Sequence, residues 1–354
     1  MLLLDNADVQ KVLDVGACLD VLEKAYRAQA AGSALGRQRT QMQVPLREPG
    51  HAYYLKTMEG SFVDAEYATL RLTSDVVSEH PVDGVPRREK LARGPGGTYC
   101  GLIMVFSVER LEPVALLHDG FLQVVRVACT SALSARLMAR PDASTLGLLG
   151  SSGQAWAHLL ALKEVQTLRR VRVHSPNPEH REIFVERASR ELGLAAEAVE
   201  SARDAVSGAD LVVAATNTSR PIVDGSWLAP GAHVVSIVSG DEGMPRRELD
   251  NEVFRRAALV VAHTREGARR QPQGDLWEVV EAGILSWETI PELCELVAGK
   301  HAGRASASDI TVFKNNVGLG LQFAAIAPRI YELARAAGIG RELPGEWFLQ
   351  DMKP

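Results

Sequence analysis

The chain has 354 residues, which is long enough for two domains, and its 46% hydrophobic and 23% charged residues are the balance of an ordinary globular protein. Its net charge of −5 disfavours a nucleic-acid partner, which would require a basic face. The four cysteines are scattered and the nine histidines show no ligand spacing, so we expect reduced thiols, a cytoplasmic location and no metal. We recognise no apolar run of membrane-spanning length and no signal peptide, and therefore expect no membrane partner.

The first third of the chain mixes one helix with several strands. The helix is expected over Ala17–Ala31, because its apolar residues fall on one face and Gly32 follows it. Strand-like runs follow at Arg39–Val44, His51–Met58, Ala68–Leu72, Cys100–Ser107 and Pro113–His118. The short connection between the last two runs predicts a hairpin.

A stretch rich in proline, glycine and charged residues, Val76–Tyr99, separates two of these predicted strands. It is long for a loop without secondary structure in a compact domain, so we interpret it as functional or mobile. Its basic residues either form a solvated rim or close as a lid over an anionic ligand.

From residue 123 onward, short apolar runs alternate with helical patterns, after a small-residue helix over Gln123–Met138. The alternating segments are Thr145–Leu149, Gln154–Val165, Arg170–His174, Glu179–Leu192, Ala209–Ala215, His233–Val238 and Ala258–His263. Continuous β-branched runs between helices are typical of buried parallel strands, so we predict an α/β fold with a doubly wound parallel sheet. A last helix, Gly318–Ala337, is expected to return to the first domain.

A turn rich in glycine and serine joins the first of these strands to its helix. It consists of Gly150, Ser151, Ser152, Gly153, Gln154 and Ala155. Gly150 and Ala155 match the first and third positions of a dinucleotide-binding fingerprint. Ser152 stands at the middle position, where its Cβ would crowd a pyrophosphate unless Gly153 takes the close approach. The serine hydroxyls are alternative phosphate donors. An ordinary strand-to-helix turn is the competing interpretation, and we predict a dinucleotide site.

The end of the second strand bears on the choice of cofactor. Arg170–His174 is followed by Ser175, by Asn177 and, four residues later, by Arg181. An NAD-preferring site places an Asp or Glu here to hold the ribose 2′-hydroxyl, and this chain has none. We therefore favour NADP(H) over NAD(H), with Arg181 as the partner of the 2′-phosphate. The alternative is that Arg181 lies on a helix surface without a role.

A third loop belongs to the predicted cofactor site. Thr216, Asn217 and Thr218 follow the strand-like run Ala209–Ala215. Loops at this place border the cofactor in doubly wound sheets, so these residues are expected either to orient the nicotinamide or to cap backbone groups.

Motifs spread along the chain carry a family resemblance. They are Arg126-Val127-Ala128-Cys129-Thr130-Ser131-Ala132-Leu133, Gly147-Leu148-Leu149-Gly150 with Gln154-Ala155, Gly231-Ala232-His233-Val234-Val235 through Gly240-Asp241 to Glu248-Leu249, Gly299-Lys300 with Gly303-Arg304, and Phe313-Lys314 with Val317-Gly318. In this order and spacing the chain resembles the ornithine cyclodeaminase/μ-crystallin family over nearly its whole length.

The resemblance implies a fold and an assembly. It implies a Rossmann dinucleotide-binding domain over 123–305. An α+β domain made of 1–122 with 306–354 would bind the substrate and form a homodimer. Family members interconvert amino acids and imines through a bound nicotinamide, so a small amino-acid or imine substrate is expected.

The resemblance also assigns roles to individual residues. The family's carboxylate-binding arginine before the Rossmann domain falls on Arg126, an earlier one near Arg39, and a cationic residue that is usually lysine on Arg71. The family's catalytic aspartate falls on Asp241. The glutamate with which cyclodeaminases contact the substrate's distal amine falls on Lys56, which inverts the charge at that position.

Each of these roles has a structural alternative. Arginine suits a carboxylate because its donors are planar and bidentate, but Arg71 is equally a salt-bridge partner and cannot replace a proton-donating lysine. Asp241 is either the group that moves a proton on the substrate nitrogen or a loop aspartate that satisfies its own turn. Lys56 holds a second acidic group of the substrate, donates a proton, or lies on the surface.

The leading interpretation is an NAD(P)-dependent oxidoreductase that acts on a CH–NH or C=N bond of an amino-acid-like substrate. One alternative is ornithine cyclodeamination, a lyase reaction that recycles bound NAD. Another is a μ-crystallin-like protein that binds NADP(H) without much turnover. Lys56 disfavours ornithine, whose distal ammonium it would repel.

Overall fold

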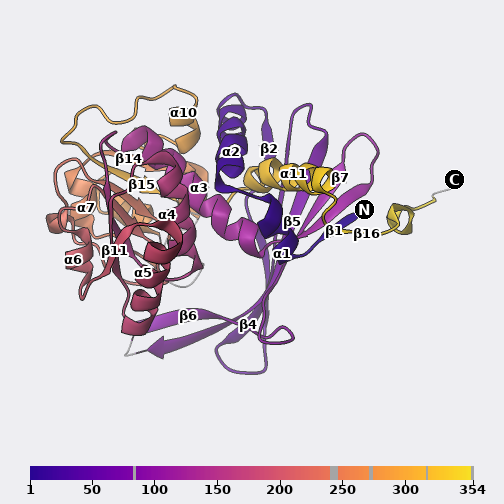
Figure 1. Ribbon diagram of the computed structural model, residues 1–354, viewed down its shortest axis with the longest axis horizontal. Helices are drawn as coiled ribbons and strands as arrows, with labels where there is room; N and C mark the ends of the chain where they lie inside the picture. Colours follow the sequence, from indigo (N-terminus) through magenta and orange to yellow (C-terminus); the bar gives the residue numbers. More distant parts are fainter. Residues whose placement is uncertain (83–84, 240–245, 271–273, 316–317, 352–354) are drawn as a thin grey trace. The chain divides into compact units, whose positions relative to one another are not determined.

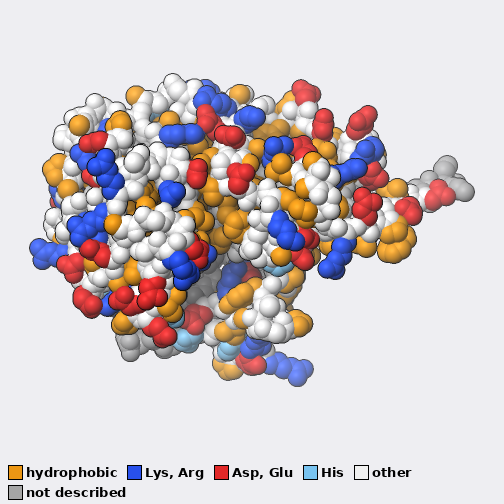
Figure 2. Space-filling model, viewed as in Figure 1, with side chains coloured by type: hydrophobic (Ala, Val, Ile, Leu, Met, Phe, Trp, Pro, Cys, Tyr) orange, Lys and Arg blue, Asp and Glu red, His pale blue; other side chains and the backbone are white. Residues whose placement is uncertain are grey.

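The computed structural model describes residues 1–82, 85–239, 246–270, 274–315 and 318–351, with the backbone alone at 81, 82 and 85–88 (Figure 1). The chain divides into two compact units. Unit 1 consists of Met1–Arg126 and Gly318–Pro354, and unit 2 is the continuous segment Val127–Val317. Figure 2 shows acidic and basic side chains interspersed over the visible face.

Unit 1 is built on a nine-stranded, mostly antiparallel sheet whose main path runs β16-β1-β8-β7-β5-β4-β2, with β3 on β4 and β6 on β5. Only β1 and β8 pair in parallel. The strands are β1 (Leu2–Leu4), β2 (Ala34–Gly36), β3 (Thr40–Pro45), β4 (His51–Phe62), β5 (Tyr67–Val82), β6 (Val85–Leu91), β7 (Cys100–Ser107), β8 (Pro113–His118) and β16 (Arg341–Glu342). The hairpin of β7 and β8 is the one that the sequence predicts.

The helices of unit 1 are α1 (Asn6–Val12), α2 (Val15–Ala30), α11 (Gly320–Ala337) and the 3-10 turn η3 (Gly345–Phe348). Asp14 caps α2 by accepting a hydrogen bond from Ala17 N at 2.6 Å. Helix α11 packs on β4, β5 and α2 (Figure 1). Its first turn touches the sheet backbone, because a Cβ on Gly320 would lie 1.8 Å from the Glu59 carbonyl oxygen. Glycine is therefore required at this crossing.

The proline-rich stretch 76–99 is largely regular, which corrects the expectation of an unstructured loop. Strand β5 continues to Val82 and pairs antiparallel with β6. Both Pro81 and Pro86 lie in this ribbon, opposite each other. Strand β6 pairs only with β5, and an outer strand tolerates a residue that cannot donate a backbone hydrogen bond. Prolines and charged residues make β6 hard to recognise in the sequence, but an edge strand tolerates both.

Unit 2 is built on a seven-stranded parallel sheet in the order β11-β10-β9-β12-β13-β15-β14. The strands are β9 (Thr145–Leu149), β10 (Arg170–His174), β11 (Ala195–Ala198), β12 (Leu211–Ala214), β13 (His233–Ser236), β14 (Ala257–Ala262) and β15 (Ile310–Lys314). The continuous apolar runs that predict buried parallel strands form β9, β12 and β13, which are buried almost throughout. The predicted α/β fold with a doubly wound sheet is confirmed.

The helices of unit 2 are α4 (Gly153–Val165), α5 (Pro178–Leu192), α6 (Ala202–Val206), α7 (Asn251–Arg256), α8 (Arg265–Arg270), α9 (Asp275–Glu281), α10 (Leu293–Val297) and the turns η1 (Gly225–Trp227) and η2 (Trp287–Thr289). Strand β15 is absent from the predicted elements, and residues 306–317 are predicted to belong to the other domain. The prediction is wrong there, because β15 lies between β13 and β14 in this sheet. Its two polar residues, Thr311 and Lys314, leave only three apolar residues, which form no continuous run.

Helix α3 (Gly120–Met138) crosses from the residues of unit 1 to those of unit 2. By length and composition it is apolar enough to span a membrane, which corrects the expectation that the chain has no such run. Most of it is buried inside the protein, and it carries the buried Arg126. These are the properties of a core helix.

Candidate functional site

The order of strands in unit 2 reverses direction at β9. Strand β10 lies on one side of β9 and β12 on the other. Open α/β sheets bind ligands in the crevice beyond the carboxyl ends of their strands at such a point. Gly150 follows β9 here with φ +111°, and a Cβ on it would lie 2.4 Å from the Ala215 carbonyl oxygen after β12. The glycine that begins the predicted phosphate-binding turn is therefore required by the backbone.

The turn itself leaves the start of α4 accessible. Ser152 is the N-cap of α4, exposed and extended, and its side chain makes no cap hydrogen bond. A Cβ on Gly153 would meet nothing within 4 Å, so this glycine is not needed for packing. The start of α4 is thus exposed at Ser152 and Gly153, and the free amides of a helix start are suited to binding a pyrophosphate. Ala155 is buried, as a helix that packs closely on its strand requires.

The residues after β10 are bound to one another. The Ser151 hydroxyl donates to Ser175 Oγ at 3.0 Å. Arg181 is buried, which excludes a surface role, and it donates to the Ser175 carbonyl at 3.0 Å and to the exposed Glu200 carboxylate at 2.8 Å. Asn177 caps α5 by accepting from His180 N. Of these groups, Arg181 is the cation that a 2′-phosphate would meet, in competition with Glu200.

The loop after β12 is anchored by its first residue. Thr216 donates from its backbone N and from its Oγ1 to Glu248 Oε1, both at 2.8 Å. Thr218 accepts from Arg220 N and donates to the Arg220 carbonyl, so it holds a turn. Asn217 is exposed. The capping interpretation therefore describes Thr216 and Thr218, and Asn217 is the member that points to solvent.

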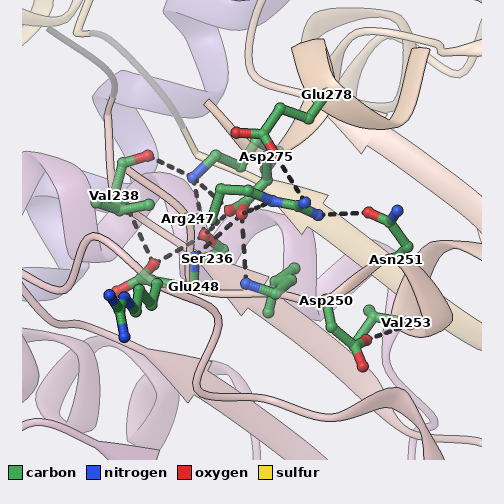
Figure 3. A network of polar contacts seen from close by, with 12 residues as sticks. Ser236, Val238, Arg247, Glu248, Asp250, Asn251, Val253, Asp275 and Glu278 are labelled. Carbon is green, nitrogen blue, oxygen red and sulfur yellow. Dashed lines mark hydrogen bonds and ion pairs between the residues drawn. The ribbon is translucent and has the colours of Figure 1, made fainter. Parts of the chain in front are cut away.

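A buried network of charges surrounds Glu248 (Figure 3). Glu248 Oε2 accepts from Ile237 N and Val238 N at 2.9 Å, and the Ser236 hydroxyl lies 2.8 Å from it. The Ser236 hydroxyl also lies 2.8 Å from Asp275 Oδ2. Asp275 Oδ1 in turn accepts from the backbone N of Glu248 at 3.0 Å. Burial raises the pKa of the Glu248 carboxyl, against the opposing effect of Lys314.

Two cations complete this network. Lys314 Nζ lies 3.1 Å from Asp275 Oδ2 and donates to Ser236 Oγ at 2.7 Å and to the Val238 carbonyl. Arg247 Nε lies 3.6 Å from Asp275 Oδ1, and its terminal nitrogens bind Glu278 and Asn251 (Figure 3). Glu248 and Lys314 stand in the motifs that carry the family resemblance, but no role is predicted for any of these charged residues. The available signal is the charged Lys314 at the end of a mostly apolar strand.

Asp241, the predicted catalytic aspartate, lies outside the described residues. The described chain resumes at Arg246, two residues before Glu248. Its predicted role is therefore taken up as a proposal below.

Unit 1 brings the predicted cations Arg71 and Arg126 to one aromatic ring. Their guanidinium carbons lie 4.9 and 5.4 Å from the centre of the Phe323 ring on α11. Arg71, on β5, donates to both Asp119 oxygens at 2.6 to 3.0 Å and to Gln123 at 3.3 Å. The salt-bridge alternative thus applies to Arg71, which does not exclude contact with a ligand.

Arg126 lies on α3 and donates to Gln322 Oε1 at 3.0 Å. Its pKa is lowered to about 10, first by burial and then by the positive charges of Arg71 and Arg39, while Asp119 acts in the opposite direction. Two guanidinium groups, those of Arg71 and Arg126, thus lie on the same ring. Neighbouring guanidinium groups suit an anion such as a carboxylate.

Lys56 is buried on β4, which excludes the surface interpretation. Its ammonium lies 3.6 Å from Asp75 Oδ2 on β5 and 5.1 Å from the centre of the Tyr54 ring. Asp75 has a second cationic partner, Lys90 on β6, at 3.0 Å. Two ammonium groups thus share one buried carboxylate. Among the described residues no cluster of His, Cys, Asp and Glu is arranged to hold a metal ion.

Comparison with known proteins agrees with this arrangement. The model of the ornithine cyclodeaminase/mu-crystallin family matches residues 1–338. An uncharacterized cyclodeaminase of Sinorhizobium fredii is 34% identical over 240 residues, 68% of this chain and 71% of that protein. A delta(1)-pyrroline-2-carboxylate reductase of Bacillus cereus is 30% identical over 260 residues, 73% of this chain and 78% of that protein.

Solved structures give the same result. The delta(1)-pyrroline-2-carboxylate reductase of Thermococcus litoralis, in complex with NADH and L-proline, superposes with a TM-score of 0.84 at 28% identity, covering 97% of this chain and 100% of that one. A probable ornithine cyclodeaminase of Bordetella pertussis gives 0.78 at 28% identity, with 97% and 100% coverage. The predicted resemblance is confirmed: the chain belongs to the ornithine cyclodeaminase/mu-crystallin family of NAD(P)-dependent enzymes.

Proposed function

We propose that this protein reduces the C=N bond of an imine derived from an amino acid, or oxidises the corresponding amine, with NAD(P)(H). The observation that carries the proposal is the pair of buried guanidinium groups, Arg71 and Arg126, that face the ring of Phe323, with Asp119 bound to Arg71. Two neighbouring guanidinium groups suit a substrate carboxylate, because arginine binds carboxylates bidentately. Unit 1 is accordingly proposed as the substrate-binding and dimer-forming unit.

Unit 2 fits a dinucleotide. Gly150 makes the required turn, and the accessible start of α4 supplies amides to the pyrophosphate. We propose NADP(H) as the preferred cofactor, because no acid follows β10 and Arg181 lies there. NAD(H) is the alternative, and the Thermococcus litoralis reductase is described with NADH. When bound, the cofactor supplies or accepts the hydride.

The chain's own groups must carry the accompanying proton. In reduction, the substrate carbon gains a hydride and the nitrogen gains a proton, so an imine becomes an amine and NAD(P)H becomes NAD(P)⁺. We propose Asp241 as the group that exchanges or steadies this proton. Arg71 is assigned to the carboxylate, because its guanidinium does not deprotonate and it is already bound to Asp119.

Lys56 favours this reaction over ornithine cyclodeamination. With Lys90 it places two ammonium groups at Asp75. A further ammonium on the substrate close to Lys56 would be repelled, which costs energy at short range. A substrate with a neutral or acidic side chain avoids this cost. The protein is proposed to work as a cytoplasmic homodimer, and its four cysteines are free thiols.

A substrate screen tests the proposal. Cyclic imino acids, and 2-oxo acids mixed with amines, are supplied with NADPH or NADH while absorbance at the reduced nicotinamide band is followed. Consumption that depends on the imine is expected. Asp241→Asn should lower turnover by about 100- to 10,000-fold and leave cofactor affinity unchanged. Unchanged turnover in this variant would show that Asp241 is not the proton-transferring group.

Two other outcomes would replace the proposal. Ammonia and proline formed from ornithine, without net change in NADPH, would identify a cyclodeaminase. Tight binding of NADPH without turnover of any compound would identify a binding protein of the μ-crystallin kind.

A further inference from the structure

A carboxylate ends the pairing between two strands of unit 2. The ladder of β12 and β13 stops at the pair Ala214 and Ser236. Beyond it, the amides of Thr216, Ile237 and Val238 all donate to the side chain of Glu248, at 2.8 to 2.9 Å. Glu248 therefore supplies an acceptor to three backbone groups at these strand ends, of which Ile237 N also donates to the Ala214 carbonyl at 3.3 Å. It sets the separation of the two strand ends.

Glu248 is itself held by two further charged residues, Asp275 and Lys314. Asp275 accepts from the Glu248 backbone N at 3.0 Å and lies 3.1 Å from Lys314 Nζ. Lys314 stands at the end of β15, the next strand after β13, and donates to the Val238 carbonyl. Glu248, Asp275 and Lys314 are at most 1% exposed. Breaking one member leaves buried charge or buried amides without compensation, so the arrangement is stiff.

These strand ends lie on one side of the predicted pyrophosphate site. Gly150 packs against the Ala215 carbonyl, directly before Thr216. The adenosine ribose of a bound dinucleotide belongs at the end of β10, near Ser175. Strands β10 and β12 flank β9 on opposite sides, so the other half of the dinucleotide must extend over the ends of β12 and β13.

We propose that Glu248 and Lys314 are positioning residues for the nicotinamide-bearing half of the cofactor. They hold the backbone at Thr216 and Val238 as the wall against which that half rests. They touch neither the pyrophosphate turn nor the adenosine side. The inference rests on the proposed dinucleotide-dependent function. It adds that Glu248 and Lys314 control affinity for the nicotinamide-bearing half without controlling affinity for the adenosine half.

The test compares whole and half cofactors on variants of the full-length protein. Glu248→Gln keeps the size of the side chain but turns an NH₂ group toward one set of amide donors. NADPH and NADH are titrated by fluorescence, and the adenosine half, as ADP and its 2′-phosphate, by calorimetry. We expect dinucleotide affinity to fall by about tenfold or more, since a hydrogen bond to a charged group is lost. Affinity for the half cofactors should stay within about twofold.

A matched control lies at the opposite edge of the same sheet. Asp210 accepts from Ser144 N and Thr145 N, both at 3.0 Å, where β9 begins. Asp210→Asn should lower the melting temperature without changing affinity for either whole or half cofactor. This variant shows the effect of losing a carboxylate that binds backbone amides far from the carboxyl ends of the strands.

The outcomes separate the inference from the proposed function. Equal weakening of whole and half cofactors by Glu248→Gln, or no weakening of either, would overturn the positioning role alone. A wild type that binds no dinucleotide would overturn the proposed function and the inference with it. If Glu248→Gln does not fold, Lys314→Met serves as the second variant, because Arg247 still faces Asp275. The same difference between whole and half cofactors is expected, and its absence contradicts the proposal.

Discussion

At the scale of single residues, the structure changes what several predicted side chains do. Arg181 is predicted to meet a 2′-phosphate and is found buried, with Ser175 and Glu200 as partners. Lys56 is predicted on charge inversion alone and is found beside Asp75. Neither partner follows from the sequence, because both depend on pairings between segments that are distant along the chain. The sequence shows which charged residues are candidates, but it does not show which residues they contact.

The affinity of the protein for its substrate should depend on Arg126. Arg126→Ala removes a charged donor from a buried site, so KM for the imine should rise by roughly 10- to 100-fold while kcat changes less. Steady-state kinetics with saturating NADPH measure both constants. Arg126→Lys should recover only part of the loss, since lysine lacks the planar pair of donors. A change in kcat alone would place Arg126 outside the substrate site.

Cofactor selectivity should respond to the ion pair of Arg181 and Glu200. Glu200 is 87% exposed in its side chain and competes with a 2′-phosphate for the guanidinium. Glu200→Gln should therefore tighten NADPH binding by a few-fold at most, as expected of an exposed pair, and leave NADH binding unchanged. Fluorescence titration of both nucleotides gives the ratio. Tighter binding of NADH than NADPH by the wild type would contradict the predicted preference.

At the scale of elements, the periodicity of apolar residues predicts most of the parallel strands of unit 2. The β-branched runs give β9, β10, β12, β13 and β14 within a few residues, and the glycine turn gives the start of α4. The strands that periodicity misses include β11, β15, whose three apolar residues are interrupted by threonine and followed by lysine, and the β5–β6 ribbon with its prolines. Their strand character comes from neighbours in the sheet, which a single segment does not reveal.

Two histidines in buried elements should make unit 2 sensitive to acid. Burial lowers the pKa of His158 on α4 to about 4 and that of His233 on β13 to about 3. Each is neutral when folded and takes up a proton on unfolding below its usual pKa of about 6.5. The stability that they contribute is complete above that pH. It is lost as the pH falls toward 4 and 3, by up to about 1.4 kcal/mol per pH unit for each histidine.

Denaturant unfolding at several pH values between 7.5 and 4.5 measures this slope. His158→Gln, whose parent residue contacts Ser131 Oγ at 2.9 Å, should be less stable at every pH but have a flatter slope. The free energy of unfolding of the wild type should fall throughout the interval below pH 6.5. A slope that is identical in the variant would show that folding does not lower the pKa of His158.

At the scale of the whole molecule, apolar exposure is concentrated in unit 1. Of the large hydrophobic side chains that are exposed in the described part of the chain, all but Ile183 belong to that unit. Met42 and Val44 on the outer strand β3 are 52% and 40% exposed. Apolar surface of this kind marks contacts between proteins, and most oligomers are symmetric. The predicted homodimer should therefore form through unit 1.

Light scattering with substitution tests the assembly. The wild type should show the mass of a dimer, or a multiple of it, at micromolar concentration. Met42→Glu combined with Val44→Glu should shift the mass toward the monomer. Ile183→Glu is the control, since it introduces the same charge at an exposed apolar position of unit 2 and should leave the mass unchanged. A wild type that is monomeric would refute the homodimer.

The return of α11 to the sheet of unit 1 affects the order in which the two units fold during synthesis. Unit 2 is one continuous segment, and it is complete when the ribosome has passed residue 317. Unit 1 begins earlier but cannot close until α11 is made, since Gly320 must meet Glu59 backbone to backbone. At ordinary rates of synthesis the strands of unit 1 wait about 10 to 40 s for their covering helix. The half of the protein that is made first is therefore the half that finishes folding last.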